Sequence, residues 1–349
     1  IRDLNEAPFN LTISSNLVEN TPVGVPVGTA TAADVDLNDV LTYSLVAGTG
    51  STDNSLFSIT PQGVLQHLEP LDFETKSSYS IRVRATDKGG LFVENSAVLA
   101  VIDQNEAPTQ VVLSASSLSE NLGANATVGW LSTVDQDAFD TFTYSFVTGV
   151  GSTDNAAFSI VGNGLQAAAH FDFETKNAYS VRIRSTDAGG LFSEQFFAIS
   201  VKDENEAPTL VSLSNSSVLE NAPAGTLVGF ATTSDVDAGD SFTYSLVAGV
   251  GSEDNSAFAI VNNRLETTLA FDFESKSSYT VRLQSIDRGG LSTESPFVIQ
   301  VIDANDLPTS LNLSSTQVNE NVTVGFLIGL LSSTDQDVSD TVTYRFVAG

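Results

Sequence analysis

The chain of 349 residues carries 43 acidic and only 14 basic side chains. This balance, a net charge of −29, argues against nucleic-acid binders and against docking on anionic membranes, since both need lysine and arginine. The lack of cysteine excludes disulfides, zinc–thiolate sites and thiol nucleophiles, whereas 41% hydrophobic residues place the acid on folded domains rather than on a disordered tail.

A D-x-N-[ED]-x-P motif recurs with a period of 100 residues, from Asp3, Asp103, Asp203 and Asp303. Each period then shows a Glu-Asn pair, a D-x-D, a D-F-E and a [TI]-D-x-G-G motif in the same order, although the chain ends before a fourth D-F-E. Such periodicity predicts tandem copies of one domain. We therefore expect a preceding junction over 1–8, repeat 1 over 9–108, repeat 2 over 109–208, repeat 3 over 209–308, and the truncated start of repeat 4 over 309–349.

Both ends of the chain interrupt a repeat, and position 1 is not methionine, so we expect a piece of a longer array. The fourth fragment, if it folded alone, would leave its apolar face uncovered. No apolar run approaches 18 residues, which predicts no transmembrane helix and no membrane insertion in this stretch.

Within each repeat the polarity pattern favours strands. Residues 41–45 and 79–85 alternate apolar and polar side chains, as do 179–185 and 279–285, while 98–102 is a continuous apolar run typical of a central strand. Glycine, proline, aspartate and asparagine punctuate these segments. About seven short strands in 100 residues predict an all-β fold of tandem Greek-key seven-stranded β-sandwiches joined end to end.

The distinctive acidic residues recur at the junctions and leave the strands nearly free of acid. Like charges at about 4–5 Å cost roughly 1 kcal/mol per pair even in water, so these carboxylates need a cation. The few lysines and arginines cannot supply it, because many lie on the outward side of strands. Ca²⁺ takes six to eight oxygen ligands and so fits Asp, Glu and Asn, whereas zinc and copper prefer His or Cys. The sequence therefore predicts Ca²⁺ as the bound ion.

The ordered set E-N, D-x-D, [LF]-D-F-E, T-D-x-G-G and D-x-N-E-x-P resembles the cadherin repeat, and its N-E-A-P junctions resemble the bacterial branch of that family most. The resemblance covers the whole chain and implies end-to-end sandwiches with up to three Ca²⁺ at each junction. It also implies the metal ligands, by junction from the N-terminus: Asp3, Asn5, Glu6, Asp34, Asp36 and Asp87; Glu19, Asp72, Glu74, Asp103, Asn105, Glu106, Asp135, Asp137 and Asp187; Glu120, Asp172, Glu174, Asp203, Asn205, Glu206, Asp235, Asp237 and Asp287; Glu220, Asp272, Glu274, Asp303, Asn305, Asp306, Asp335 and Asp337.

The junctions depart from the animal pattern in two ways. Ala7, Ala107, Ala207 and Leu307 stand where the animal linker has a second asparagine, and the linker is one residue shorter. The D-F-E phenylalanine replaces the usual arginine. Both differences leave open whether a junction holds two ions or three.

Other conspicuous residues have plainer interpretations. We expect His67 and His170 to be surface histidines, Trp130 to be a partly buried strand residue, and the G-S-[TE]-D-N segments to be Asx or glycine turns rather than ion sites. Asp72 and Glu74 could be mistaken for a glycosidase pair, but they recur at each junction without a second constellation, so we expect no enzyme.

The resemblance implies a calcium-rigidified extracellular rod of a cell-surface adhesion protein, secreted and of bacterial type. Its partners would be the neighbouring repeats, and either a second copy, another surface protein or a glycan. Two alternatives remain open: a passive spacer carrying a separate binding or enzymatic domain, and a carbohydrate-binding repeat. Exposed aromatic patches unique to one repeat would favour binding, and uniformly bland faces would favour the spacer.

Overall fold

The computed structural model describes residues 4–36, 39–337 and 340–348. It divides into two compact units, Ile1–Lys202 with repeats 1 and 2, and Asp203–Gly349 with repeat 3 and the start of repeat 4. The predicted all-β fold is confirmed: the described residues contain no α-helix, and three-residue 3-10 turns are their only helical elements.

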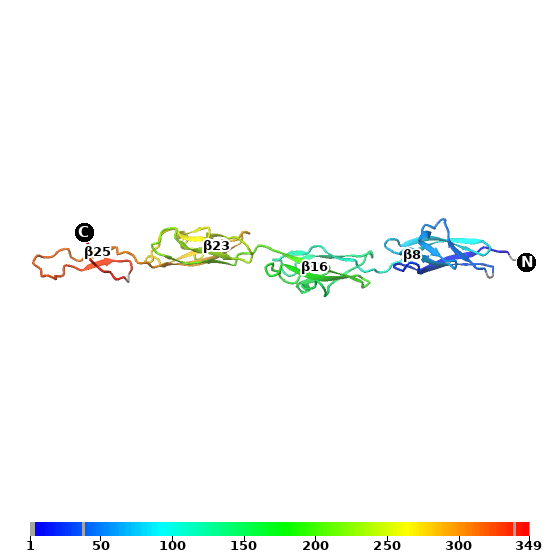
Figure 1. The fold of residues 1–349 in the computed structure, drawn as a ribbon, viewed down its shortest axis with the longest axis horizontal. Coiled ribbons are helices and arrows are strands. Elements are labelled where there is room, and N and C mark those ends of the chain that lie inside the picture. Colours follow the sequence, from blue (N-terminus) through cyan, green and yellow to red (C-terminus); the bar gives the residue numbers. More distant parts are fainter. Residues whose placement is uncertain (1–3, 37–38, 338–339, 349) are drawn as a thin grey trace. The chain divides into compact units, whose positions relative to one another are not determined.

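Each complete repeat is a sandwich of two four-stranded sheets (Figure 1). The elements of repeat 1 are β1 (Phe9–Ser15), β2 (Leu17–Val18), β3 (Pro26–Ala33), β4 (Thr42–Leu45), η1 (Asn54–Leu56), β5 (Phe57–Ile59), β6 (Val64–His67), β7 (Ser78–Thr86) and β8 (Phe92–Ile102). One sheet has the order β1-β3-β6-β5 and the other β2-β8-β7-β4.

Repeats 2 and 3 have the same arrangement. The elements of repeat 2 are β9 (Gln110–Leu113), β10 (Ser117–Ser119), β11 (Thr127–Val134), β12 (Thr143–Phe146), η2 (Asn155–Ala157), β13 (Phe158–Val161), β14 (Gly164–Ala167), β15 (Ala178–Thr186) and β16 (Phe192–Lys202). Those of repeat 3 are β17 (Leu210–Leu213), β18 (Ser217–Leu219), β19 (Leu227–Ser234), β20 (Thr243–Leu246), η3 (Asn255–Ala257), β21 (Phe258–Val261), β22 (Arg264–Thr267), β23 (Ser278–Ile286) and β24 (Ser292–Ile302).

The first strand of each repeat is split between the two sheets, which is why eight segments appear where seven strands were predicted. In repeat 1, β1 pairs antiparallel with β3, and β2 then pairs parallel with β8. The chain crosses between sheets at Asn16, whose N–H donates to the carbonyl of Val27. This crossing closes one side of the sandwich with a single stretch of chain.

The strands predicted from alternation lie where expected, and the core follows their inward positions. Along β7 the side chains of Ile81, Val83 and Ala85 are fully buried. The apolar run at 98–102 is central, because β8 pairs with both β2 and β7. It is not buried on both faces, however: Leu99 is 2% exposed whereas Val98 is 74% exposed, since an antiparallel sandwich leaves one face in water.

The described part of repeat 4 has only β25 (Ser310–Leu313) and β26 (Leu331–Thr334), paired antiparallel. Large apolar side chains such as Leu311, Phe326 and Leu331 remain exposed there. The prediction of an uncovered apolar face is therefore confirmed.

His67 corrects an expectation. It is fully buried rather than on the surface, because it occupies an inward position of β6 opposite Phe57. Its Nδ1 lies 2.8 Å from the carbonyl oxygen of Glu69. The same inward positions of repeats 2 and 3 carry Ala167 and Thr267, which are also buried. His170 is exposed, as predicted.

Trp130 also differs from expectation. It lies in β11 as predicted but is 55% exposed, because it points away from the core. Its strand neighbour is Gly164, which has no side chain beside the ring.

Candidate calcium junctions

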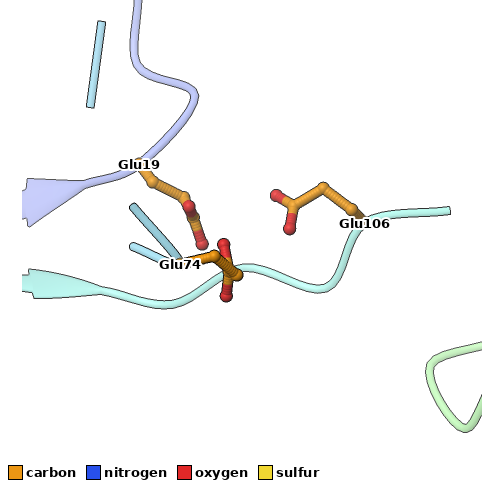
Figure 2. Close-up of side chains that lie close together, drawn as sticks. All are labelled: Glu19, Glu74 and Glu106. Carbon is orange, nitrogen blue, oxygen red and sulfur yellow. The ribbon is translucent and has the colours of Figure 1, made fainter. Parts of the chain in front are cut away.

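The carboxylates predicted at the junction of repeats 1 and 2 gather within one small volume. Ligand oxygens of Glu19, Glu74 and Glu106 lie within 4.8 Å of one another, and their side chains turn toward a common point in Figure 2. A second such group joins Glu74 to Asp103 and Asp137. The two groups share Glu74, so the D-F-E turn of repeat 1, the linker and the D-x-D loop of repeat 2 meet there.

Glu19 is held rigidly although it is a buried acid. It is 3% exposed, and it follows β2, whose parallel pairing with β8 brings it to the linker. The backbone N–H of Phe73 donates to Oε2 at 2.7 Å and that of Gln104 to Oε1 at 2.6 Å. In repeat 3, Glu220 accepts from Phe273 and Ala304 at 2.8 and 2.7 Å, so the arrangement recurs.

Several carboxyl groups at this junction have raised pKa values. Burial, and then the charge of Glu19, raise the pKa of the Glu106 carboxyl to about 7. Burial also raises the pKa of Asp103 and of Glu74, and the charges of Glu19 and Asp137 add to both shifts. Without a cation these groups therefore repel one another and favour protonation.

The linker is anchored on the following repeat by two hydrogen bonds. The backbone N–H of Glu106 donates to Oδ2 of Asp137 at 2.8 Å, and Asn105 Nδ2 donates to Oδ2 of Asp187 at 3.0 Å. Asp187 is 6% exposed and also accepts from the N–H of Leu191. The linker thus reaches the second repeat through the residues predicted to be ligands.

The same contacts appear at the other linkers, each within its own unit. Asn5 donates to Asp87 at 2.9 Å and Asn205 to Asp287 at 3.0 Å. The N–H of the linker acid binds the second aspartate of D-x-D in the pairs Glu6–Asp36, Glu206–Asp237 and Asp306–Asp337. Asp3 lies outside the described residues.

The D-x-D and D-F-E motifs form local turns. Oδ1 of the first aspartate accepts from the N–H of the second in Asp34–Asp36, Asp135–Asp137, Asp235–Asp237 and Asp335–Asp337. In D-F-E, the carboxylate of the aspartate accepts from the residue three positions on, in Asp72–Thr75, Asp172–Thr175 and Asp272–Ser275. These hydrogen bonds lower the pKa of Asp172 and of Asp272.

The remaining predicted residues divide between the two units. In unit 1, Glu120 is buried and accepts from the N–H of Phe173, while Glu174 is exposed. In unit 2, burial and then the charges of Glu220 and Asp337 raise the pKa of both Glu274 and Asp303. Asp203 belongs to unit 2, and Asn305 donates to the carbonyl of Asp306.

Two kinds of residue at the junctions were missed from the sequence. Asn20 and Asn221, the second members of the Glu-Asn pairs, adopt left-handed φ values of 58° and 57° and donate to the linker acids Glu106 and Asp306. A tolerance for this conformation is typical of asparagine and was the available signal. A third aspartate also follows each D-x-D three residues on, and Asp140 lies within the group of Asp135 and Asp137.

An oxygen-binding cation fits this junction. Glu106 Oε2, Asp135 Oδ2 and Asp137 Oδ1 are buried and have no hydrogen-bond donor. A buried carboxylate oxygen that contacts neither water nor a hydrogen-bond donor costs free energy unless a cation takes their place. The atoms available to bind such a cation are all oxygens, as a hard cation requires.

Comparisons with known proteins agree with this architecture. Residues 13–103 match the family model described as Cadherin domain. The chain is 29% identical to human Cadherin EGF LAG seven-pass G-type receptor 2 over 96% of its length, and 27% identical to Protocadherin-like wing polarity protein stan of Drosophila melanogaster over 99%. It spans only 12% and 10% of those relatives.

Solved structures show the same fold. The Protocadherin GammaB4 extracellular domain matches with a TM-score of 0.63 at 23% identity, covering 96% of this chain and 57% of that one. The Protocadherin gammaB7 EC3-6 cis-dimer structure matches with a TM-score of 0.63 at 22% identity, covering 93% and 84%. The chain therefore has the fold of the tandem sandwich repeats in these structures, and its residues 13–103 match the model of the cadherin domain.

Among the described residues, no helix has the length and apolar character needed to cross a bilayer.

Proposed function

We propose that this chain is a calcium-stiffened extracellular segment of a surface adhesion protein. One observation carries the proposal: carboxylates from repeat 1, the linker and repeat 2 converge at one junction and leave buried oxygens without donors. Bound calcium would neutralise these groups and tie the two repeats together through them. The role is mechanical and adhesive rather than enzymatic.

The residues that would hold calcium at this junction are the predicted set of Glu19, Asp72, Glu74, Asp103, Asn105, Glu106, Asp135, Asp137 and Asp187. The equivalent sets of the other junctions would act alike, with the repeat boundaries as predicted. Glu19 and Asp187 are already oriented by backbone donors, which reduces the ordering that binding requires. Because the linker departs from the animal pattern, each junction would hold two or three ions.

Affinity should suit the outside of a cell. Extracellular calcium modules commonly bind with dissociation constants of about 10⁻⁴–10⁻³ M. Calcium is millimolar outside cells and far scarcer inside them, so the repeats would be loaded only after export. The relatives named above are animal proteins, and the bacterial assignment rests only on the [LF]-D-F-E-[TS]-K-x-x-Y segments and the N-E-A-P linkers of the sequence.

Small-angle scattering tests the stiffening. We expect the maximum dimension and the shape of the pair-distance distribution to change when calcium is replaced by EDTA, because the junction carboxylates then repel one another. Magnesium serves as the control, since it keeps its waters and rarely uses all-protein cages. Identical curves in calcium and in EDTA would disprove the stiffening.

A specific observation favours an adhesive role over a passive spacer. Repeat 2 exposes Trp130, Phe139 and Phe196 at 55%, 100% and 51%. Repeat 1 carries Thr29 and Ser96 at the positions of Trp130 and Phe196, whereas repeat 3 carries Phe230, which is 43% exposed, and Pro296; Gly239 stands at the position of Phe139. Trp130 and Phe196 lie on different sheets, so repeat 2 offers an exposed aromatic side chain on each face.

Bead aggregation tests whether these faces bind a second copy. We expect beads coated with the chain to aggregate in calcium, and to aggregate less when Trp130→Thr and Phe196→Ser give repeat 2 the residues of repeat 1. Phe230→Thr in repeat 3 is the matched control. Dispersed beads at every calcium concentration would support the spacer.

A further inference from the structure

His67 is a buried titratable side chain that the proposed calcium junctions do not use. It lies at the end of β6 with no exposed surface, and its Nε2 has no hydrogen-bond partner among the described residues. The equivalent positions of repeats 2 and 3 carry Ala167 and Thr267, which cannot change charge. Repeat 1 alone therefore has, at this position, a group that can respond to mild acid.

The tautomer of His67 follows from the one contact of its ring. Nδ1 lies 2.8 Å from the carbonyl oxygen of Glu69, which can only accept a hydrogen bond, so Nδ1 carries the proton and donates. In the neutral ring Nε2 is then an acceptor without a donor. A second proton would turn Nε2 into a charged donor without an acceptor inside the core, which is strongly unfavourable.

The strands around β6 cannot compensate such a charge. β3 and β5 flank β6 in its sheet, and neither contains a titratable side chain. In the core that β6 shares with the opposite sheet, the titratable group is the phenol of Tyr79, whose ring meets Phe57 edge-on at 5.4 Å. Lys76 Nζ lies 4.7 Å from the centre of the same ring, and its positive charge would repel an imidazolium.

The acids of repeat 1 are engaged by other groups. Those that are buried, or that follow β6 in the D-F-E turn, accept hydrogen bonds from partners other than the imidazole: Glu19, Asp53, Asp72 and Asp87. Glu94 of β8 pairs with the two arginines of β7. Glu69 is exposed, and its backbone carbonyl rather than its carboxylate contacts the ring. In the described structure an imidazolium would therefore have no anionic partner.

We propose that His67 is an acid-sensitive switch of repeat 1, in which Nε2 takes up a proton only when the end of β6 leaves the core. The opened chain then binds one proton more than the folded chain below about pH 6.5, the ordinary pKa of an unfolded histidine. Stability falls with falling pH wherever the unfolded state binds more protons, so repeat 1 loses stability in mild acid. Repeats 2 and 3 do not share this loss.

Opening of this strand end would reach the junction with repeat 2. The backbone carbonyl of His67 accepts from the N–H of Gly24 at 3.1 Å, which holds the end of β6 against the loop before β3. A few residues further on, the chain enters the D-F-E turn with Glu74, a member of both carboxylate groups at the junction. Acid would therefore loosen the turn that presents Glu74. This consequence rests on the proposed function, whereas the switch itself depends only on protons.

Hydrogen–deuterium exchange of the whole chain in saturating calcium tests the switch. After correction for intrinsic rates, the amides of 64–71 should lose protection below about pH 6.5, by up to about tenfold per pH unit. The equivalent residues 164–171 and 264–271 are internal controls. His67→Thr, which gives repeat 1 the residue of repeat 3, should abolish the loss. Thr267→His should confer it on repeat 3, because position 267 is also buried and also lies opposite a phenylalanine.

Histidine NMR of the wild type keeps the test independent of variants that fold poorly. The chain has two histidines, so a His170→Gln variant assigns the ring signals. The ¹⁵N shifts of His67 should keep the pattern of a neutral ring protonated at Nδ1 for as long as β6 stays protected. A ring that takes up a proton while β6 remains protected would overturn the inference, and so would equal acid sensitivity in wild type and His67→Thr. A wild type that binds no calcium would contradict the proposed function alone.

Discussion

At the residue scale, the two glycines of each [TI]-D-x-G-G motif serve different ends. Gly190 has a φ of +93° and supplies the left-handed turn that was expected of the pair. Gly189 is needed for space, because a Cβ there would lie 2.3 Å from Oδ1 of Asn105. The linker asparagine therefore packs on bare backbone while it donates to Asp187.

We predict that Gly189→Ala displaces Asn105 and loosens the junction. Overpacking of this kind costs about 1–3 kcal/mol, and calcium affinity should fall with it. Calorimetric titration and thermal unfolding of the whole chain measure both effects. Gly123→Ala is the matched control, since its Cβ would meet only His170 Cε1 at 3.6 Å. Wild-type affinity and melting in Gly189→Ala would contradict the prediction.

At the scale of elements, the G-S-[TE]-D-N loop is hydrogen-bonded to the first half of β7 and of its counterparts. Asp53 is 8% exposed, and its carboxylate accepts from Lys76 Nζ at 2.5 Å and from the N–H of Ser80 at 2.8 Å. Asn54 Oδ1 accepts from the N–H of Arg82. The interpretation as a plain turn was therefore incomplete, because the loop also makes an ion pair in which the Asp53 carboxylate is buried and the Lys76 side chain is 40% exposed.

This ion pair predicts a pH dependence. Burial alone would raise the pKa of Asp53, but the hydrogen bonds from Lys76 and Ser80 outweigh it and leave the pKa below its usual value. The stabilisation is thus complete above the unfolded-state pKa, about 3.9, and is lost as the pH falls through the folded-state value.

Asp53→Asn, Asp154→Asn and Asp254→Asn together should lower stability at neutral pH by about 1–3 kcal/mol per repeat, as expected when a buried charged partner is removed. Scanning calorimetry should show the gap to wild type narrowing in acid below about pH 4. Glu69→Gln controls for the loss of charge. A gap that stays constant from neutral to acidic pH would rule out this account of the loop.

At the scale of the whole molecule, the excess of acid follows from where the few cations are used. The ion pairs Lys76–Asp53, Arg82–Glu94 and Arg84–Glu94 lie inside a repeat, and repeat 2 has the equivalent pairs. Lysine and arginine therefore stabilise sandwiches, while junction carboxylates converge elsewhere. Much of the charge of −29 then lies in the junction carboxylates that we propose bind calcium, and the scattering change in EDTA is the corresponding prediction for the array.

Periodicity in the sequence was enough to predict the fold class, the strand positions and the convergence of acids at one junction. It worked because strands alternate with period two and because the same motifs recur in fixed order. It failed at His67, where one repeat places an imidazole at an inward position that Ala167 and Thr267 occupy elsewhere. An alignment of the three repeats would have shown that His67 shares its position with Ala167 and Thr267 and is therefore buried.

The sequence by itself determined that this protein is a tandem array of β-sandwiches with carboxylate and amide oxygens gathered at its linkers, because repetition and residue chemistry are properties of the chain. Only the tertiary structure decided which of those oxygens lack donors. Burial and hydrogen bonding depend on segments far apart in sequence, as when Glu19 meets Phe73 and Gln104. For the same reason, only the fold revealed that Asp140 joins Asp135 and Asp137 in one cluster.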